Sequence, residues 1–492
     1  MLINYQHPDD TVDSWISKAV VVFSLTLAEV SVLMFPLDVG NRRACTNAVD
    51  LSWCALTMPM RDLWYTVWMI MIILAFAILP WFLFFHETDT DHPVSKRAIS
   101  ATIWAFASTT IVLLCIGIPY AVVGYSQWPT GQLGSGTLSM TAFWSAQQAN
   151  SVECTALASA NLAAVAGGTG WCNAENTKDY NSIWPHKANF LTYSVAVVSI
   201  IGWLFVCMFA GVGAISLPMD WFFDWYTRPR KVITKTEYIS RAKTLGRRAK
   251  ELQGVGQSLR REEMAHGRSR KWRKQVSELT KQIDLLQKDD ENLTRAYPQG
   301  EERATMWMVG IVISWLKLFG SILGGVTSFL WILHMILYLF VKPPVSPFLN
   351  DMFIGLQNAW GLLGVFFFSL FCLYIVTMTI HGLFRLGFFV GVMTIHPMKL
   401  NGTFMPTFFF NCAVISILNI AIVQFCAWAF GIYADDTTVQ TIFNVEVRYL
   451  NGFGPLYDND VFQWILVASL ILAFLWFVIR GVNGRHKKGE VF

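Results

Sequence analysis

Ionisable side chains inside long apolar stretches are the first candidates for chemistry in this sequence. Glu29 and Lys317 lie in two such stretches, and His334 lies in the middle of a third. Burying a charge at membrane depth is costly, so these residues are candidates for lining a polar cavity or a proton-sensitive pocket. The alternative is structural: Glu29 and His334 would bond to neighbouring helices, and Lys317 would extend to the membrane surface.

Four of the nine cysteines lie outside the apolar stretches, in two pairs. Cys45 and Cys54 follow the first apolar stretch, and Cys154 and Cys172 share one polar loop. On an oxidising face of the membrane, two local disulfides are expected, and four free thiols are the alternative. A zinc site is disfavoured because no histidine lies near either pair at the spacing of metal ligands.

Two proline motifs interrupt the apolar pattern. In "PLDVGNRR", we expect Pro36 to end a helix, and Asp38 with Arg42 to pair across one turn or to cap freed backbone groups. In "TIHPMK", His396 and Pro397 are expected to end a re-entrant segment. Both motifs are most simply structural. We find no P-loop, no H-E-x-x-H and no G-x-S-x-G motif, so we expect no enzyme and no cofactor.

The elements that position these residues are predicted to be membrane spans. Hydrophobic residues make up 54% of the chain and charged residues 14%, whereas soluble domains carry about 25% charge. This composition predicts an all-α, polytopic helical membrane protein embedded in a lipid bilayer. Eight spans are expected, at residues 15–36, 64–86, 98–123, 189–217, 319–341, 354–380, 405–432 and 461–480.

Two further apolar segments are ambiguous. As one helix, residues 304–341 would exceed a ~30 Å bilayer core. With a break near Gly320, residues 304–318 are expected to be an interfacial or half-inserted helix. Residues 382–396 are short and contain Arg385, which favours a re-entrant or interfacial segment.

Lysine and arginine counts predict the orientation of the chain. More than half of the 37 basic residues lie in 228–303, which is therefore expected to be cytosolic. Loops 124–188 and 433–460 are expected outside, and both termini inside. The expected domains are a four-span bundle at 1–217, a basic loop at 218–303, a second four-span bundle at 304–481 and a tail at 482–492.

Residues 237–295 are predicted to form a helical hairpin with a turn at Gly267. A coiled-coil-like apolar seam follows a 4-3-4-3 spacing on the second helix. The hairpin's basic outer face could contact anionic lipid headgroups, or it is simply a solvated face. Nucleic acid is not expected as a partner. The seam consists of Trp272, Val276, Leu279, Ile283 and Leu286.

A family resemblance rests on several long motifs in a fixed order. The motifs are "NYQHPDD" (4–10), "PLDVGNRRAC" (36–45), "PPVSPFLND" (343–351), "TIHPMK" (394–399) and "QFCAWAFGIYA" (424–434). With them the chain resembles the LIMR family, the lipocalin-interacting membrane receptor relatives, most closely its plant and protist branch. Its resemblance to lysosomal cobalamin escort proteins is looser. The family pattern implies nine spans with an outside N-terminus, so the first span is expected to be missing here.

The resemblance implies a non-enzymatic receptor or transport-escort protein for a small ligand or a lipocalin-type carrier. Its partners would be an extracellular or luminal ligand and a membrane transporter or trafficking protein. One alternative is a channel or carrier that moves a cobalamin-like or lipophilic solute itself. Another is a scaffold that acts through the hairpin. The expected location is the plasma membrane or an endolysosomal membrane.

Overall fold

The helices of this chain confirm the all-α, multi-pass architecture. Eight helices in the described part are long and apolar enough to cross a membrane, and each overlaps one predicted span. They comprise Trp15–Arg42, Met60–Glu87, Val94–Val123, Phe190–Tyr226, Trp307–Phe340, Leu363–Leu386, Met405–Ala429 and Val461–Ile479. The computed structural model describes residues 2–7, 15–46, 58–88, 92–129, 183–228, 232–267, 269–297, 303–341, 344–390, 393–398, 402–435 and 437–484.

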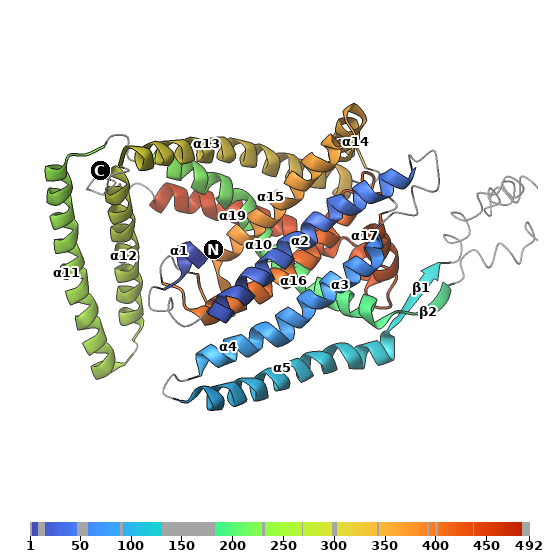
Figure 1. Cartoon of the computed structure of the whole chain (residues 1–492), viewed down its shortest axis with the longest axis horizontal. Coiled ribbons are helices and arrows are strands. Elements are labelled where there is room, and N and C mark those ends of the chain that lie inside the picture. The colour runs from blue at the N-terminus through green and yellow to red at the C-terminus, as the bar shows by residue number, and fades with distance from the viewer. Residues whose placement is uncertain are drawn as a thin grey trace, which may run out of the picture. The chain divides into compact units, whose positions relative to one another are not determined.

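Figure 1 labels many of the helices and the strands β1 and β2; in the element names, η denotes a π-helical segment. The first group is α1 (Leu2–Tyr5), α2 (Trp15–Thr46), α3 (Met60–Ile73), η3 (Leu74–Ile78), α4 (Leu79–Glu87), α5 (Val94–Val123), β1 (Tyr125–Pro129), β2 (Ile183–Lys187), α10 (Phe190–Tyr226), α11 (Lys235–His266) and α12 (Arg270–Ala296). The second is α13 (Arg303–His334), η6 (Met335–Phe340), α14 (Phe348–Ala359), α15 (Leu363–Leu386), β3 (Phe388–Val390), β4 (Met393–Ile395), α16 (Met405–Ala429), α17 (Thr438–Gln440), η7 (Thr441–Val447), α18 (Gly454–Asp458) and α19 (Val461–Gly484).

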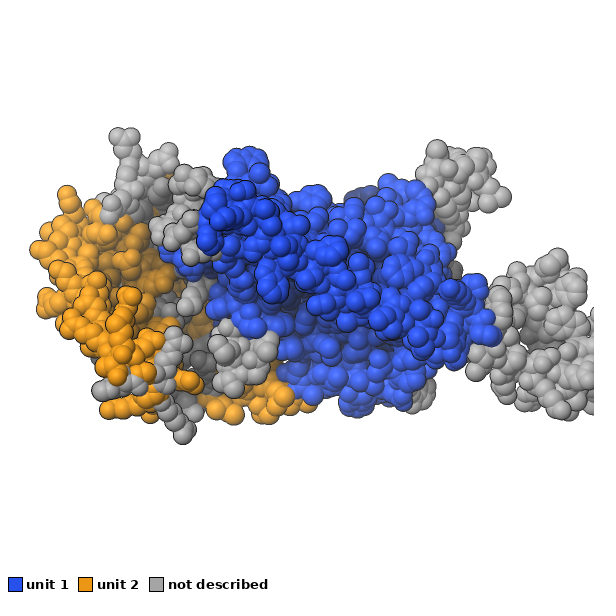
Figure 2. Space-filling model, turned by 90° about the horizontal axis from the view of Figure 1, so that it is seen from below, with its two compact units in different colours: residues 1–213, 330–470 blue, residues 214–329, 471–492 orange. Residues whose placement is uncertain are grey.

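The chain divides into two compact units, coloured separately in Figure 2. Unit 1 comprises residues 1–213 and 330–470, and unit 2 comprises residues 214–329 and 471–492. In unit 1, α16 is the central helix: it packs against α2, α4 and α15, and nearly all of its side chains are buried. A helix that is apolar on every side is expected at such a position.

Residues 304–341 differ from the sequence expectation. No break occurs at Gly320, because α13 runs without interruption from Arg303 to His334 and continues into η6. A Cβ on Gly320 would lie 3.0 Å from two ring carbons of Trp221. Here glycine allows α13 to approach the last turns of α10 rather than ending the helix.

The expected re-entrant segment at 382–396 is also different. Its first residues complete α15, which ends at Gly387 with a φ of 72°, where glycine is favoured. The following residues form β3 and β4, a short antiparallel pair that joins Phe388 to Ile395. The segment is therefore a helix end followed by a small hairpin.

Residues 433–460 were expected to be a loop, but they are largely helical and packed. α17 and η7 bury Val439, Ile442 and Phe443. The β1–β2 pair is joined to the end of this segment, because Gln127 N donates to Tyr449 O at 2.8 Å. Loop 433–460 is therefore a folded cap within unit 1, and we call it the cap segment.

The helical hairpin predicted for residues 237–295 is present in unit 2 as α11 and α12. Thr234 and Ser269 cap the two helices, and Gly267 forms the turn with a φ of 70°. The predicted seam is only partly buried: Trp272 donates to Leu259 O at 2.9 Å, whereas Ile283 is 46% exposed. The buried residues of α12 lie toward its C-terminal end, at Asp289, Leu293 and Ala296.

Candidate functional site

The three ionisable candidates have different surroundings. Glu29 is exposed on α2 and is not among the residues that line the two cavities described below. His334 is fully buried, with Nε2 3.1 Å from Ala429 O and its ring stacked on Phe430. In unit 2, Lys317 donates to the Asp224 carboxylate at 2.6 Å.

The Pro36 motif does not end its helix. Pro36 lies inside α2, which continues to Thr46. The carboxylate of Asp38 accepts hydrogen bonds from Trp64 Nε1 at 3.0 Å and from the backbone N–H of Val439 at 2.9 Å. Asp38 therefore joins α2 to α3 and to the cap segment. Arg42 is half-buried in the same helix.

His396 and Pro397 follow β4 rather than a re-entrant helix. His396 adopts a φ of 46°, in the left-handed region that few non-glycine residues occupy. Its ring lies 3.6 Å from the Glu87 carboxylate, and its carbonyl accepts from Asn411 Nδ2 at 3.1 Å. Pro397 is exposed. These contacts join the β3–β4 hairpin to α4 and α16.

The cysteines of the two predicted disulfides are not covered by the described part of the structure. Cys54, Cys154 and Cys172 lie outside the described residues, and so does the side chain of Cys45. Both pairings therefore stay predictions. No group of three or more metal-ligating side chains occurs among the described residues.

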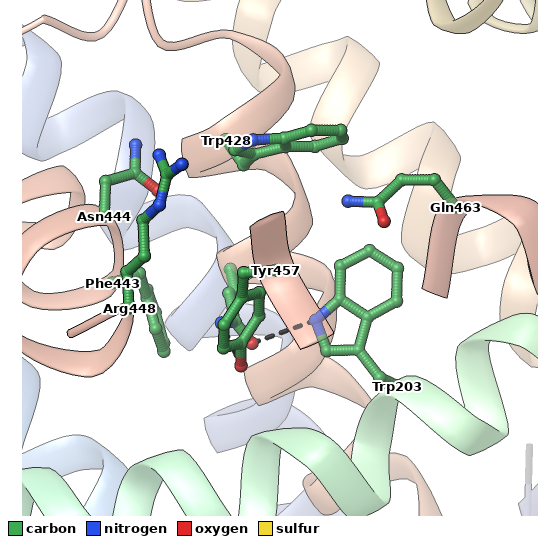
Figure 3. A pocket seen from close by; sticks show the side chains of 8 residues that line it. Trp203, Trp428, Phe443, Asn444, Arg448, Tyr457 and Gln463 are labelled. Atoms are coloured by element: carbon green, nitrogen blue, oxygen red, sulfur yellow. Dashed lines mark hydrogen bonds between the residues drawn. The ribbon is translucent and has the colours of Figure 1, made fainter. Parts of the chain in front are cut away.

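A pocket that the sequence did not predict lies between the cap segment and the neighbouring helices of unit 1. It consists of an inner cavity of about 20 Å³ and an outer cavity of about 240 Å³, which share Trp428, Arg448 and Tyr457. The inner cavity is also lined by Gln424 and Gln463. We call these two neighbouring cavities together the Arg448 pocket; Figure 3 shows the side chains that line the inner one.

The inner cavity has a fixed hydrogen-bond network. Gln424 accepts from Trp203 Nε1 at 2.9 Å and donates from Nε2 to the Tyr457 hydroxyl at 2.8 Å. Burial raises the pKa of Tyr457 to about 12, so its hydroxyl stays neutral at physiological pH. These bonds fix α10, α16 and α18 around the cavity.

Gln463, on α19, lines the inner cavity with a hydrogen-bond acceptor that is not satisfied among the described residues. Its side chain is 3% exposed, and Oε1 has no hydrogen-bond partner among the described residues. Figure 3 shows its amide directed toward the space between Trp428 and Trp203. A buried acceptor without a donor costs roughly 1–3 kcal/mol, so this position favours a donor supplied from outside the chain.

The outer cavity combines aromatic and charged side chains. Arg448 donates from Nε and Nη2 to one oxygen of Asp458, at 3.2 and 2.8 Å. Asp460 also lines the cavity and has a φ of 53°, which Asp tolerates better than most residues. Tyr338, from η6, contributes a third aromatic side chain beside Trp428 and Tyr457. The sequence signal available was Arg448 itself, the one basic residue in the acidic stretch 433–460.

Buried polar side chains also recur along α16. Asn411, Ser416 and Gln424 are each at most 3% exposed and make hydrogen bonds. Asn419 is completely buried, and neither its oxygen nor its nitrogen has a partner among the described residues. The most central helix of unit 1 therefore carries polar groups through much of its length.

The eight long apolar helices of the described residues, with large hydrophobic side chains exposed on their surfaces, define a polytopic helical membrane protein. The family model described as LMBR1-like membrane protein matches residues 1–262 and 249–477. The chain belongs to this family, which is also named LIMR.

Curated relatives agree with this family assignment. A LIMR family protein from Arabidopsis thaliana is 38% identical over 490 residues, covering 100% of this chain and 94% of the relative. One from Oryza sativa subsp. japonica is 38% identical over 494 residues, with the same coverage of both chains. A LIMR family protein from Dictyostelium discoideum is 28% identical over 500 residues, covering 96% of this chain and 93% of the relative. No solved structure matches the chain.

Proposed function

We propose that this chain is a non-enzymatic receptor or transport-escort protein that binds a small ligand in the Arg448 pocket. The observation that carries the proposal is the buried acceptor of Gln463, which faces a cavity and has no donor among the described residues. Convergent polar groups within an aromatic-lined concavity are typical of ligand sites. The ion pair of Arg448 with Asp458 would open or close the outer cavity.

The same proposal assigns the partners and the membrane. A free ligand or a lipocalin-type carrier would approach the cap segment from the extracellular or luminal side. The hairpin α11–α12 would face the cytosol, contacting anionic lipid or a transporter or trafficking partner. Both termini would be cytosolic, in the plasma membrane or an endolysosomal membrane. The disulfides Cys45–Cys54 and Cys154–Cys172 would stabilise the outer loops.

Native mass spectrometry of the chain purified from its own membrane tests the proposal. The wild type is expected to carry a small molecule that Trp428→Ala loses, because that indole lines both cavities. Trp104→Ala is the matched control, since Trp104 is 62% exposed on α5, away from the pocket lining. The proposal fails if wild type and Trp428→Ala carry the same molecules.

A second candidate function, a channel or carrier, is favoured by Asn419. An unpaired carboxamide in the interior of a spanning helix is costly unless it serves a passing polar solute or water. Asn419→Leu keeps a similar size and removes both polar groups. We expect it to unfold at the same or a higher temperature while abolishing flux in liposomes. Zero flux of the wild type across a range of solutes and pH values would exclude this candidate.

A further inference from the structure

We propose that the ligand of the Arg448 pocket is a small organic ammonium ion with an apolar body and at least one N–H donor. The inference rests on the proposed function, because it names the chemical class that the same pocket would accept. It follows from three properties of the lining: a buried acceptor without a donor among the described residues, an arginine that is already bound to a carboxylate, and aromatic walls.

The acceptor excess is clearest at Gln463. Its Oε1 is buried, has no donor among the described residues, and belongs to a side chain directed into the inner cavity. The neighbouring Gln424 already uses its Oε1 and Nε2 on Trp203 and Tyr457. A ligand donor, N–H or O–H, would therefore complete this cavity, whereas a carboxylate would leave the acceptor unpaired.

The charged side chains of the outer cavity also disfavour an anionic ligand. Asp458 and Asp460 line it together with the guanidinium of Arg448. Two donors of Arg448 point at one oxygen of Asp458, so an anionic ligand would have to compete with that carboxylate for Arg448.

The aromatic lining defines the rest of the ligand. Trp428 and Tyr457 border both cavities, and Tyr338 borders the outer one. Indole and phenol faces attract cations and pack against apolar groups. A volume of about 240 Å³ is below the range of about 300–1,000 Å³ found for drug-sized ligands, so the ligand is a small molecule.

Three probes of similar size but different charge test the ligand class. Phenethylammonium, phenylacetate and 2-phenylethanol are titrated calorimetrically into the full chain in nanodiscs made of zwitterionic lipid, which limits non-specific cation binding. We expect phenethylammonium to bind at least ~10-fold more tightly than either other probe, a difference of about 1.4 kcal/mol. Tight, Trp428-dependent binding of phenylacetate or 2-phenylethanol would overturn the ammonium assignment and leave the proposed function standing.

Two conservative variants locate the interaction. Gln463→Leu removes the acceptor, and Asp458→Asn removes the charge; each is expected to weaken phenethylammonium binding ~10-fold or more. Asp435→Asn is the control, because it removes a carboxylate of the same acidic stretch that does not line the pocket. Melting temperatures establish that each variant is folded, and Trp428→Phe replaces Trp428→Ala if the latter misfolds.

Two further results of these titrations would contradict the ammonium inference. Phenethylammonium binding that is equal in the wild type, Gln463→Leu and Asp458→Asn would place the cation elsewhere and contradict the inference. If none of the three probes binds, the ammonium class is wrong. The proposed function then depends on the native mass spectrometry alone, and it fails separately if no molecule is lost in Trp428→Ala.

Discussion

Asp38 shows how much one buried side chain contributes to this fold. Its carboxylate holds an indole N–H of α3 and a backbone N–H of α17, so three elements meet at one group. The sequence singled out Asp38 because of Pro36 and Arg42, which lie on the same helix. Its partners Trp64 and Val439 are distant in sequence, and no local pattern could predict them.

Asp38→Ala should destabilise the protein by roughly 2–6 kcal/mol, because two buried donors each lose a bond at about 1–3 kcal/mol. Asp38→Asn should cost less, since its carbonyl oxygen can still accept. Thermal unfolding in detergent measures both. Asp62→Ala, on the exposed side of α3, should stay within about 0.5 kcal/mol of the wild type. Equal effects of Asp38→Ala and Asp62→Ala would show that the bonds do not matter.

Asp289 on α12 gives a pH-dependent prediction. Burial raises its pKa above the ordinary value of 3.8, and the nearby charge of Arg248 opposes this only partly. The protonated carboxyl of Asp289 therefore contributes to the free energy of unfolding at low pH. This contribution is fully present below the unfolded-state pKa and is lost as pH rises through the raised folded-state pKa.

Asp289→Asn does not titrate, so it should gain stability relative to the wild type as pH rises from acid toward neutrality. Amide hydrogen exchange of α12 over a pH series, corrected for the intrinsic exchange rate, measures this difference. Asp290→Asn, at an exposed neighbouring position, should show no such trend. A gain that is constant across pH would argue against titration of Asp289.

At the scale of elements, a close contact between α10 and α15 depends on two glycines. A Cβ on Gly213 would meet the Met378 carbonyl, and a Cβ on Gly382 would meet the Phe209 carbonyl. Both neighbours are backbone atoms and cannot rotate away. Small residues are the usual means by which spanning helices approach closely.

Gly382→Ala should therefore destabilise the protein by about 1–3 kcal/mol, the usual cost of overpacking. Gly355→Ala is the matched control: its Cβ would have open space within α14, so it should be neutral or stabilising by up to about 1 kcal/mol. Thermal unfolding compares the two. A neutral Gly382→Ala would mean that the helices can separate without cost.

Elements with strong periodicity could be predicted, and those defined by tertiary packing could not. Apolar length predicted the eight span-length apolar helices found among the described residues, and spacing with Gly267 predicted the hairpin. The continuity of α13 depends on a tryptophan of another helix lying against Gly320. The folding of the cap segment depends on buried contacts with other elements. Its acidic composition, taken alone, predicts a polar loop.

At the scale of the whole molecule, the sequence predicts the two sides of the membrane. The cap segment is expected outside and the α11–α12 hairpin inside. In a background without reactive native cysteines, Asn459→Cys should react with an impermeant maleimide in intact cells, and Ser258→Cys only after permeabilisation. Both positions are exposed, so accessibility does not favour either. The reverse pattern would invert the topology and place the Arg448 pocket on the cytosolic side.

An electron cryomicroscopy map of the chain isolated gently from its native membrane would show directly whether the Arg448 pocket holds a ligand. We predict density between Trp428, Asp458 and Gln463 that protein and single waters do not explain, and its loss in Trp428→Ala. A pocket that is well resolved and contains only water would contradict the account.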